Sequence, residues 1–401
     1  MKQTTKKIMV VWIASFLAMT TLVTANDVKQ SASDAILSID TGGHTAMIRD
    51  IIITKNGDII SASDDKTIRV WSSRNGSEKR KILGQIGAGS EGMIFAIALS
   101  SDERYLAVGG FMDTKEGGIS VGTIRLYDYQ SGKILTLLKS HTNVVNDLSF
   151  SPDGRYLASG SGDTTVKLWD IKSFSLLQTI NFHTNDVYGV KFTDENNIIS
   201  SSDDNRIALH NLKGDMVGKP YKHSEKLSYI ATNGKTIATC GFGNEILLFD
   251  TRLVLQSKIK SETEPSGLSY SPDGRYLIAG TGVYPFNVNI YDSQKGHEKI
   301  ASFDKHTNLT RAVAFLDNQT AISGGGTNNE IYIWDIKNKE VKTKIIGAGQ
   351  MVWSVGIDGD SIAWGNTWTA NYGKTKFQKS FNLKTDIFLK NINQAYVLAI
   401  H

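Results

Sequence analysis

Apolar and polar residues alternate with a period of two along most of the chain, in short runs separated by turn-forming residues. In one well-preserved stretch Val144–Phe150 alternates, the turn residues SPDG follow, and Tyr156–Ser161, Thr165–Trp169 and Ser175–Ile180 give three more runs. Short period-two runs bounded by Gly, Pro, Asp and Ser are typical of half-buried strands. Helix-period patterns are absent. The pattern therefore predicts an all-β chain built from units of four short strands.

Each unit ends its third run with an aromatic residue or a histidine, and this position recurs at nearly constant spacing. Its copies are Trp71, Tyr127, Trp169, His210, Phe249, Tyr291, Trp334 and Phe381. The steps are 56, 42, 41, 39, 42, 43 and 47 residues, and the large step holds an insertion at Phe111–Gly122. Four short strands repeated at this period are typical of the blades of a β-propeller.

Two of the units also share a histidine, a serine, an aspartate and a tryptophan at the same spacing. These residues are His44, Ser61, Asp65, Trp71 and His141, Ser159, Asp163, Trp169. In the order and spacing of these motifs the chain resembles the WD40-repeat family from about Ala35 to Leu383. The resemblance implies a toroid of four-stranded antiparallel blades. It also implies structural tetrads, in which the histidine bridges the serine and the aspartate while the serine hydroxyl reaches the tryptophan N–H.

Serine, histidine and aspartate are also the residues of a hydrolytic triad. A triad is assembled once, beside one oxyanion hole, whereas this set is complete in two units and partial in others. We therefore expect no catalytic residues and no enzyme activity. The repeat histidines lie in different blades and cannot converge on one ion, and the single cysteine, Cys240, excludes a cysteine metal cluster. No metal and no cofactor are expected.

The repeat count favours eight blades in one ring, with seven as the close alternative. The last unit offers three strand-like runs between Met351 and Leu383, and Asp34–Thr41 is a strand-like run ahead of the first unit. An N-terminal strand that pairs into the last blade would close the ring and remove an exposed sheet edge. We therefore expect a propeller over residues 26–383 and a C-terminal extension, or the start of a further element, over 384–401.

The first 110 residues carry a second and narrower resemblance. The runs that begin at Gly42 and Gly89 resemble the leading propeller of bacterial proteins that join WD40 repeats to a caspase-like protease. This resemblance implies an alternative function, the regulatory or sensor propeller of a longer effector protein. The protease itself is not represented, because Cys240 lies within a repeat strand.

The N-terminus has the layout of a secretory signal peptide. Lys2, Lys6 and Lys7 precede the mostly apolar run Ile8–Val23, and small residues offer a cleavage site at the end of residues 1–25. The apolar run is 16 residues long, whereas a spanning helix needs ~20. We therefore favour cleavage and a periplasmic or secreted location over a retained membrane anchor.

Removal of the signal makes the chain nearly neutral. The signal holds three of the 44 basic residues and none of the 40 acidic residues, so the formal charge falls from +4 to +1. No stripe of Lys and Arg follows the repeats. We therefore expect no nucleic-acid partner, because such partners require a basic surface.

Three connections break the repeat by their length or their aromatic content. In the family that the chain resembles, the connection between the second and third strands of a blade opens on one face, beside the central channel. The residues selected there are Phe111 and Met112 in the second unit, Tyr284 and Phe286 in the sixth, and Trp368 and Tyr372 in the eighth. Aromatic residues gathered on a rim are typical of interface hot spots. We expect these six to bind a protein or peptide partner, with capping of their own blades as the alternative.

A carbohydrate-binding or hydrolytic propeller is a further alternative, in which the same rings stack on sugars. Hydrolysis would need paired carboxylates. The acidic residues near these loops, Glu91, Asp113 and Glu116, show no pairing in the sequence.

Overall fold

The computed structural model describes residues 42–84, 90–112, 122–326 and 329–346 in full, and the backbone of six further strands. The chain divides into two compact units. The larger one, which we call the ring unit, comprises residues 42–352 and 367–374. The smaller one comprises residues 1–41, 353–366 and 375–401.

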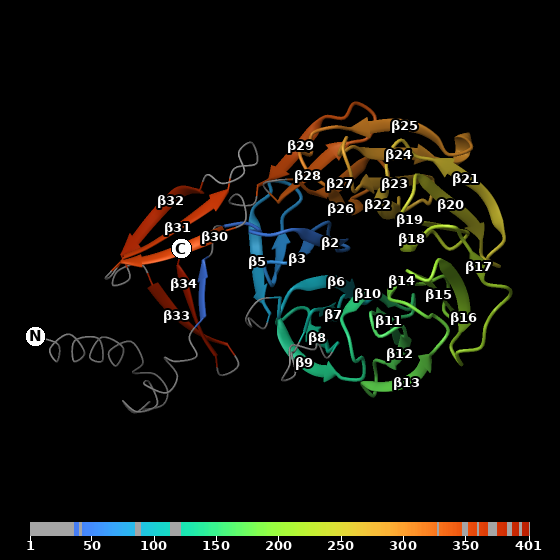
Figure 1. Cartoon of the computed structure of the whole chain (residues 1–401), viewed down its shortest axis with the longest axis horizontal. Coiled ribbons are helices and arrows are strands. Elements are labelled where there is room, and N and C mark those ends of the chain that lie inside the picture. Colours follow the sequence, from blue (N-terminus) through green and yellow to red (C-terminus); the bar gives the residue numbers. More distant parts are fainter. Residues whose placement is uncertain are drawn as a thin grey trace, which may run out of the picture. The chain divides into compact units, whose positions relative to one another are not determined.

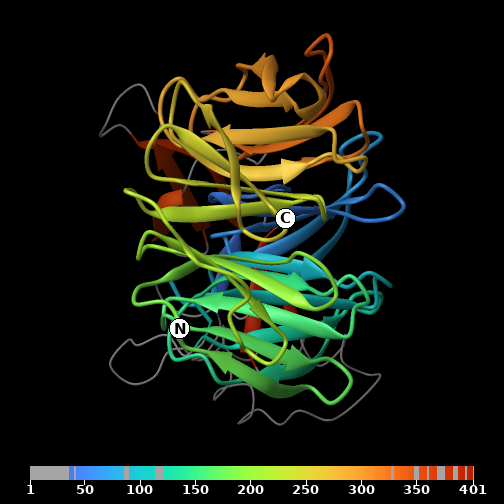
Figure 2. The same cartoon turned by 90° about the vertical axis from the view of Figure 1, so that its right-hand side faces the viewer.

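The ring unit contains seven four-stranded antiparallel sheets, and each is formed by four strands that are consecutive in the chain. Blade 1 consists of β2 (Ile48–Ile53), β3 (Ile59–Ser63), β4 (Thr67–Trp71) and β5 (Glu78–Leu83), and blade 2 consists of β6 (Ile94–Leu99), β7 (Tyr105–Gly110), β8 (Ile124–Asp128) and β9 (Lys133–Leu138). Blade 3 consists of β10 (Val145–Phe150), β11 (Tyr156–Ser161), β12 (Val166–Asp170) and β13 (Ser175–Ile180). Blade 4 consists of β14 (Val187–Phe192), β15 (Asn197–Ser202), β16 (Arg206–Asn211) and β17 (Tyr221–Lys222). Blade 5 consists of β18 (Leu227–Thr232), β19 (Thr236–Gly241), β20 (Glu245–Asp250) and β21 (Leu255–Lys260). Blade 6 consists of β22 (Pro265–Tyr270), β23 (Tyr276–Thr281), β24 (Val288–Asp292) and β25 (Glu298–Phe303). Blade 7 consists of β26 (Thr310–Phe315), β27 (Thr320–Gly325), β28 (Glu330–Asp335) and β29 (Val341–Ile345). The first strand of each blade lies nearest the centre of the ring (Figure 1), and Figure 2 shows the blades from the side.

The four-stranded antiparallel blades confirm the predicted architecture, but the favoured count of eight blades is wrong, because the ring has seven. Blade 7 already has four strands of its own, so it needs no N-terminal strand. Its buried side chains pack on blade 1, where Ala312 of the innermost strand and Ile345 of the outermost strand share one buried cluster with Ile48 and Trp71. The ring therefore closes by side-chain packing after Ile345, well before the predicted boundary at residue 383.

The strands that were expected to form the eighth blade belong to other sheets. They are β30 (Val352–Asp358), β31 (Ser361–Thr367) and β32 (Thr375–Asn382), which form a three-stranded sheet of their own. The N-terminal strand β1 (Ile36–Ile39) pairs in parallel with β34 (Ala395–Ile400), and β33 (Ile387–Ile392) completes that sheet. None of the helices among the described residues is long and apolar enough to cross a membrane.

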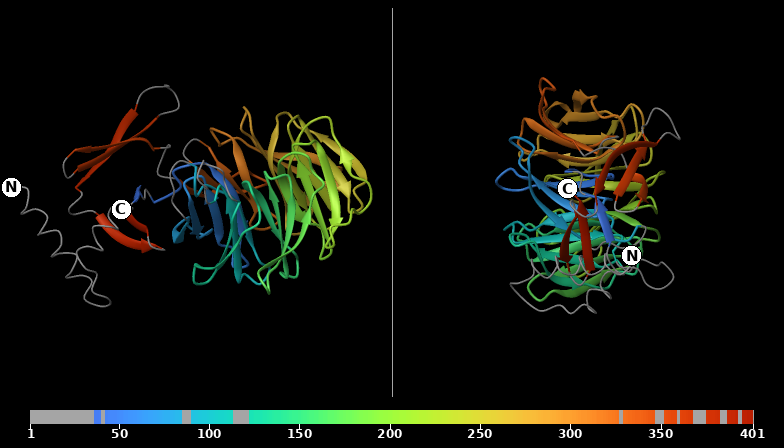
Figure 3. Two further views of the ribbon diagram at one scale, coloured as in Figure 1. Left: turned by 60° about the horizontal axis from the view of Figure 1, so that its bottom comes forward. Right: turned by 90° about the vertical axis from the view of Figure 1, so that its left-hand side faces the viewer.

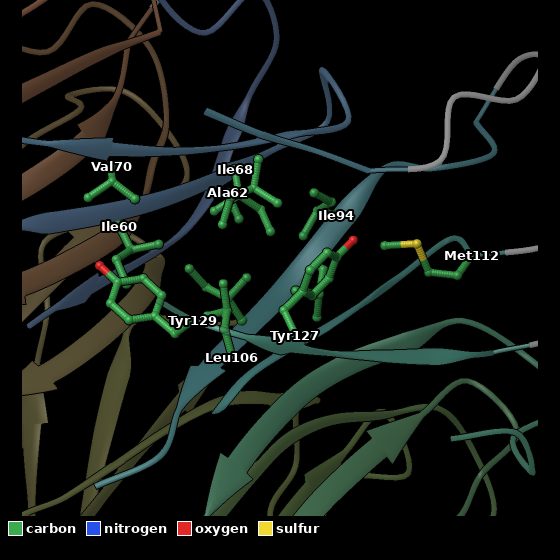
Figure 4. Packing of buried hydrophobic residues seen from close by; sticks show 12 residues of the cluster. Ile60, Ala62, Ile68, Val70, Ile94, Leu106, Met112, Tyr127 and Tyr129 are labelled. Atoms are coloured by element: carbon green, nitrogen blue, oxygen red, sulfur yellow. The ribbon is translucent and has the colours of Figure 1, made fainter. Parts of the chain in front are cut away.

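The hydrophobic pattern of each strand follows its distance from the centre of the ring. The middle strands are buried on both faces, as in β3 and β4, while the outer strand β9 alternates between exposed and partly buried positions before its buried last residue. The core lies between neighbouring blades rather than within one blade, as the stacked sheets of Figure 3 show. In Figure 4, Ile60 and Val70 of blade 1 face Leu106 and Tyr127 of blade 2. Each blade is thus stabilised by its two neighbours.

Blades 6 and 7 approach each other most closely at two glycines. A Cβ atom at Gly267 would lie 2.0 Å from the carbonyl oxygen of Arg311, and one at Gly280 would lie 2.2 Å from that of Thr310. No side chain can occupy either space while the backbones stay in place. Gly267 of β22 and Gly280 of β23 therefore set how closely β26 approaches blade 6.

Candidate binding face of the ring

The tetrad in blade 3 is a fully connected hydrogen-bond network. His141 Nδ1 lies 2.8 Å from an Asp163 carboxylate oxygen, His141 Nε2 lies 2.7 Å from Ser159 Oγ, and Trp169 Nε1 donates to the same Oγ at 2.9 Å. Because the carboxylate only accepts, Nδ1 carries the imidazole proton and Nε2 accepts from the serine hydroxyl. The serine and the histidine are both buried. Because Ser159 is fully buried, a substrate cannot reach its hydroxyl.

The Asp163 carboxylate is the most heavily bonded group of this network. It also accepts hydrogen bonds from the Thr142 and Thr165 N–H groups, both at 3.0 Å, and from the Thr165 hydroxyl at 2.6 Å. Burial alone would raise the pKa of Asp163, but the hydrogen bond and charge of His141, with Thr165, outweigh it and hold that pKa well below its usual range. The carboxylate therefore links the segment before the first strand of the blade, at Thr142, to the turn between its second and third strands, at Thr165.

Blade 1 contains the same network at nearly the same distances. His44 lies 2.9 Å from Asp65 and 2.7 Å from Ser61 Oγ, to which Trp71 Nε1 donates at 2.8 Å. Burial opposes ionisation of Asp65, but His44 lowers the pKa of Asp65 to about 2. All eight residues of the two tetrads are thus brought together as two separate groups of four.

Blade 4 keeps only part of the network. His183 lies 2.8 Å from Ser200 Oγ and 3.0 Å from Asp204, but His210 stands where the tryptophan would be. The described part of the chain offers no hydrogen bond to the buried His210 imidazole. Burial, together with the nearby His183, lowers the pKa of His210 to about 4.

Blade 5 departs furthest, because Gly243 stands at the position of the tetrad aspartate. His223 Nε2 lies 3.5 Å from Glu245. A hollow of about 440 Å³ opens beside them. The charged groups of its wall are Lys222, Glu225, Glu245 and Lys258. Two lysines and two glutamates balance, so the hollow favours no single class of ligand.

One face of the ring is defined by a backbone hydrogen bond that all seven blades repeat. The N–H of a residue after the second strand donates to the carbonyl of the residue just before the first strand, at 2.9 to 3.4 Å. The donor–acceptor pairs are Asp64–Met47, Phe111–Met93, Gly162–Val144, Asp203–Asp186, Phe242–Lys226, Gly282–Glu264 and Gly326–Leu309. We call these residues the rim. They lie at the end of the inner strands where each first strand begins, and thus surround the centre of one face.

The rim combines aromatic surface with ion pairs in the sector of blades 4 and 5. Lys226 Nζ lies 2.6 Å from Asp203 and 5.5 Å from the centre of the Phe242 ring. Phe242 is 52% exposed, and Tyr188, at the start of β14, is 39% exposed. Burial and the charge of Asp203 raise the pKa of Asp186. This sector presents two exposed rings around a compact group of charges.

A second sector joins blades 1 and 2. Arg49 donates two hydrogen bonds to the Asp64 carboxylate, at 2.8 and 2.9 Å, and its guanidinium lies 4.5 Å from the centre of the Phe95 ring. Arginine held by a carboxylate over an aromatic face is pre-organised, so it loses little rotamer freedom when a partner covers it.

The six residues selected for partner binding have three different outcomes. Phe111 is a partly exposed rim residue, and Tyr284 is 83% exposed with its ring 6.0 Å from that of Phe286. Met112 is only 1% exposed, because its side chain enters the core with Ile94 and Tyr127 (Figure 4). The remaining two, Trp368 and Tyr372, lie outside the described residues.

The sequence reasoning missed Phe242, Tyr188 and Lys226, because it searched only connections that were unusually long or unusually rich in aromatic residues. Phe242 lies three residues after the position of the tetrad serine, as Asp64 and Asp203 do in their blades. An alignment of the units on that position would have found the rim. Among the described residues, no group of three or more His, Cys, Asp or Glu side chains could hold a metal ion.

The chain matches the family model described as WD domain, G-beta repeat, over residues 36–72, 132–170 and 174–211. It is 36% identical over 138 residues to a nuclear distribution protein PAC1-2 of Uncinocarpus reesii, which is 30% of this chain and 28% of that protein. It is 34% identical over 139 residues to a ribosome biogenesis protein WDR12 homolog of Trichoplax adhaerens, covering 33% and 29%. It is 26% identical over 278 residues to the human pre-mRNA-processing factor 17, covering 64% and 38%.

The matched part is well under half of each of these relatives. No enzyme family is indicated by these matches. The seven four-stranded blades make the ring a seven-bladed β-propeller, and three segments of the chain, between residues 36 and 211, are similar to WD40 repeats.

Proposed function

We propose that this propeller is a non-catalytic scaffold that binds a protein or peptide partner through the face that carries the rim. One observation carries the proposal: Phe242 and Tyr188 are large, exposed aromatic side chains beside an ion pair, on a face held rigid by a repeated backbone hydrogen bond. Rigid aromatic groups with a polar surround are typical of interface hot spots. The relatives named nuclear distribution and ribosome biogenesis proteins support a scaffold role.

The test is the double variant Tyr188→Ala with Phe242→Ala. A partner is first captured from an extract by the wild-type chain, identified by mass spectrometry and produced separately, and its affinity is then measured by calorimetry. We expect the double variant to bind at least about tenfold more weakly, because truncated hot-spot residues cost this much or more. Its thermal unfolding should stay close to that of the wild type, since both side chains are exposed.

The matched control is Leu177→Ala on the outer strand β13, where the leucine is 48% exposed. This variant removes a similar apolar surface away from the rim and should bind with unchanged affinity. Equal affinity of the rim variant and the wild type would refute the proposal. The role as the sensor of a longer caspase-like protein stays a prediction that no structural observation favours.

Export is a separate part of the proposal and rests on residues 1–25, which lie outside the described residues. Cleavage by a signal peptidase would leave Asn26 as the first residue. Mass spectrometry of the protein purified from its own cells should find this N-terminus in the exported fraction. Full-length chains that begin at Met1 in that fraction would contradict cleavage.

A further inference from the structure

Two aspartates occupy equivalent positions on inner strands and perform the same structural task. Asp50 in β2 accepts from its neighbour Ile51 N at 2.8 Å and from Ile97 N of blade 2 at 3.0 Å. Asp147 in β10 accepts from its neighbour Leu148 N and from Val190 N of blade 4, both at 2.9 Å. Each carboxylate thus joins its own blade to the inner strand of the next blade. The two sites are copies of one arrangement.

The copies differ in one group, a cation. Lys191 follows Val190 in β14, and its Nζ lies 2.8 and 2.9 Å from the two oxygens of Asp147. The residue that follows Ile97 in β6 is Ala98. Blade 2 therefore has a short alanine side chain at the position from which blade 4 extends a lysine side chain with its ammonium group. Asp50 keeps the two N–H donors of the arrangement, but no cation of the described residues lies in hydrogen-bond contact with it.

The electrostatics at Asp50 reflect this difference. Burial raises the pKa of Asp50 to about 7, and its two N–H donors and the nearby Lys191 only partly oppose that effect. Asp147 contributes in the same direction as burial. An opposite charge in direct contact usually lowers the pKa of a carboxyl group by one to three units. A cation beside Asp50 would therefore be bound with release of a proton.

In the copy formed by blades 3 and 4, the cation is open to solvent. The Lys191 side chain is 32% exposed although it contacts Asp147 on the inner strands. Asp50 is itself partly exposed and lies on β2, one of the strands nearest the centre of the ring (Figure 1). Lys191 reaches Asp147 from its own strand. A lysine side chain of a partner would instead enter from the rim and present its ammonium group to Asp50.

We propose that Asp50 binds the ammonium group of a lysine side chain that a partner inserts into the centre of the ring, in the place that Lys191 takes beside Asp147. The proposal rests on the proposed function, since it names the group by which the partner is held. Blade 4 supplies the geometry, because its own lysine shows how an ammonium group bonds to both oxygens of this arrangement. Free alkylammonium ions share this chemistry, and the experiment separates them from inorganic cations.

The experiment measures the pKa of Asp50 by carbon-13 NMR of the full chain labelled at aspartate, with Asp50→Asn to assign the signal. The probe is n-butylammonium, which is the lysine side chain without its backbone, and potassium chloride and 1-butanol are the controls. We expect n-butylammonium to lower the pKa of Asp50 by at least about one unit, and both controls to leave it unchanged. An equal effect of potassium would refute a side-chain site, and no effect of the ammonium probe would refute the site altogether.

Two variants use the copy in blades 3 and 4. Ala98→Lys should fill the site from within, so that the pKa of Asp50 falls without the probe and no longer responds to it, while Ala98→Met controls for the added bulk. Lys191→Ala should create a second site at Asp147 and roughly double the bound probe. If Ala98→Lys does not fold, Lys191→Ala still decides the matter, because an unchanged amount of bound probe contradicts the arrangement. The rim variants test the partner-binding function independently, since this probe needs no partner.

Discussion

Gly267→Ala is expected to destabilise the ring by about 3 kcal/mol, near the upper end of what overpacking costs. The added methyl group would lie 2.0 Å from the carbonyl oxygen of Arg311, and no side chain can move aside to relieve a contact with backbone. The inner strands β22 and β26 must therefore separate, which opens the packing between blades 6 and 7. Urea unfolding followed by tryptophan fluorescence measures the loss.

Gly282→Ala is the matched control from the same blade. Its methyl group would meet the Ser266 Cβ at 3.4 Å, an ordinary van der Waals distance. We expect a change within about 0.5 kcal/mol, as for most substitutions away from the core. Similar stabilities for the two alanine variants would mean that the blades can separate at little cost.

Asp163→Ala is expected to cost about 3 kcal/mol or more, because it removes several hydrogen bonds to one charged acceptor, and such bonds contribute about 1.5–3 kcal/mol each. The carboxylate is only 7% exposed and accepts from His141, from two backbone N–H groups and from the Thr165 hydroxyl. All four donors would lose their acceptor, which is costly when they are shielded from water. Thermal and urea unfolding check this value.

The comparison variants rank the parts of the network. Ser159→Ala should cost less, about 1–3 kcal/mol, because a neutral group is lost. Asp170→Ala should cost least, since this aspartate accepts hydrogen bonds from Ser173 in an exposed turn. Because the pKa of Asp163 is lower in the folded chain than its ordinary value of 3.8, the ionised carboxylate stabilises the fold at every pH above 3.8. This contribution is lost as the pH falls from 3.8 through the lowered pKa. The gap between wild type and Asp163→Ala should therefore narrow in acid. A constant gap would show that the charge is unimportant.

The sequence was sufficient for the strands and their grouping, because both depend on short-range patterns. Alternation and turn residues mark each strand, and the spacing of His141, Ser159, Asp163 and Trp169 follows from a network inside one blade. The number of blades depends instead on contacts between strands far apart in the chain, such as β2 with β26. Periodicity continues through Phe381 and does not reveal at which unit the ring closes.

The candidate site was predicted only in part for a related reason. Length and aromatic content selected Phe111 and Tyr284, which are on the surface, but also Met112, which packs into the core beside Ile94. Whether a loop residue is exposed depends on the neighbouring blade, which the pattern of one unit does not contain. Phe242 was missed because its turn is short and regular, and only the ring places its exposed side chain on the rim.

The closure of the ring by packing alone has a mechanical consequence. The covalent chain crosses every junction between neighbouring blades except the one between blade 7 and blade 1. That junction is a seam, at which the inner strand β26 and its neighbour β27 lie against β2, and side chains from all four strands of blade 7 share one buried cluster with β2, β3 and β4. Tension on the two ends of the ring would part this seam before it unravelled any sheet, because no strand is shared across it. The seven blades would stay folded in an open arc, and the ring would form again once the tension is released.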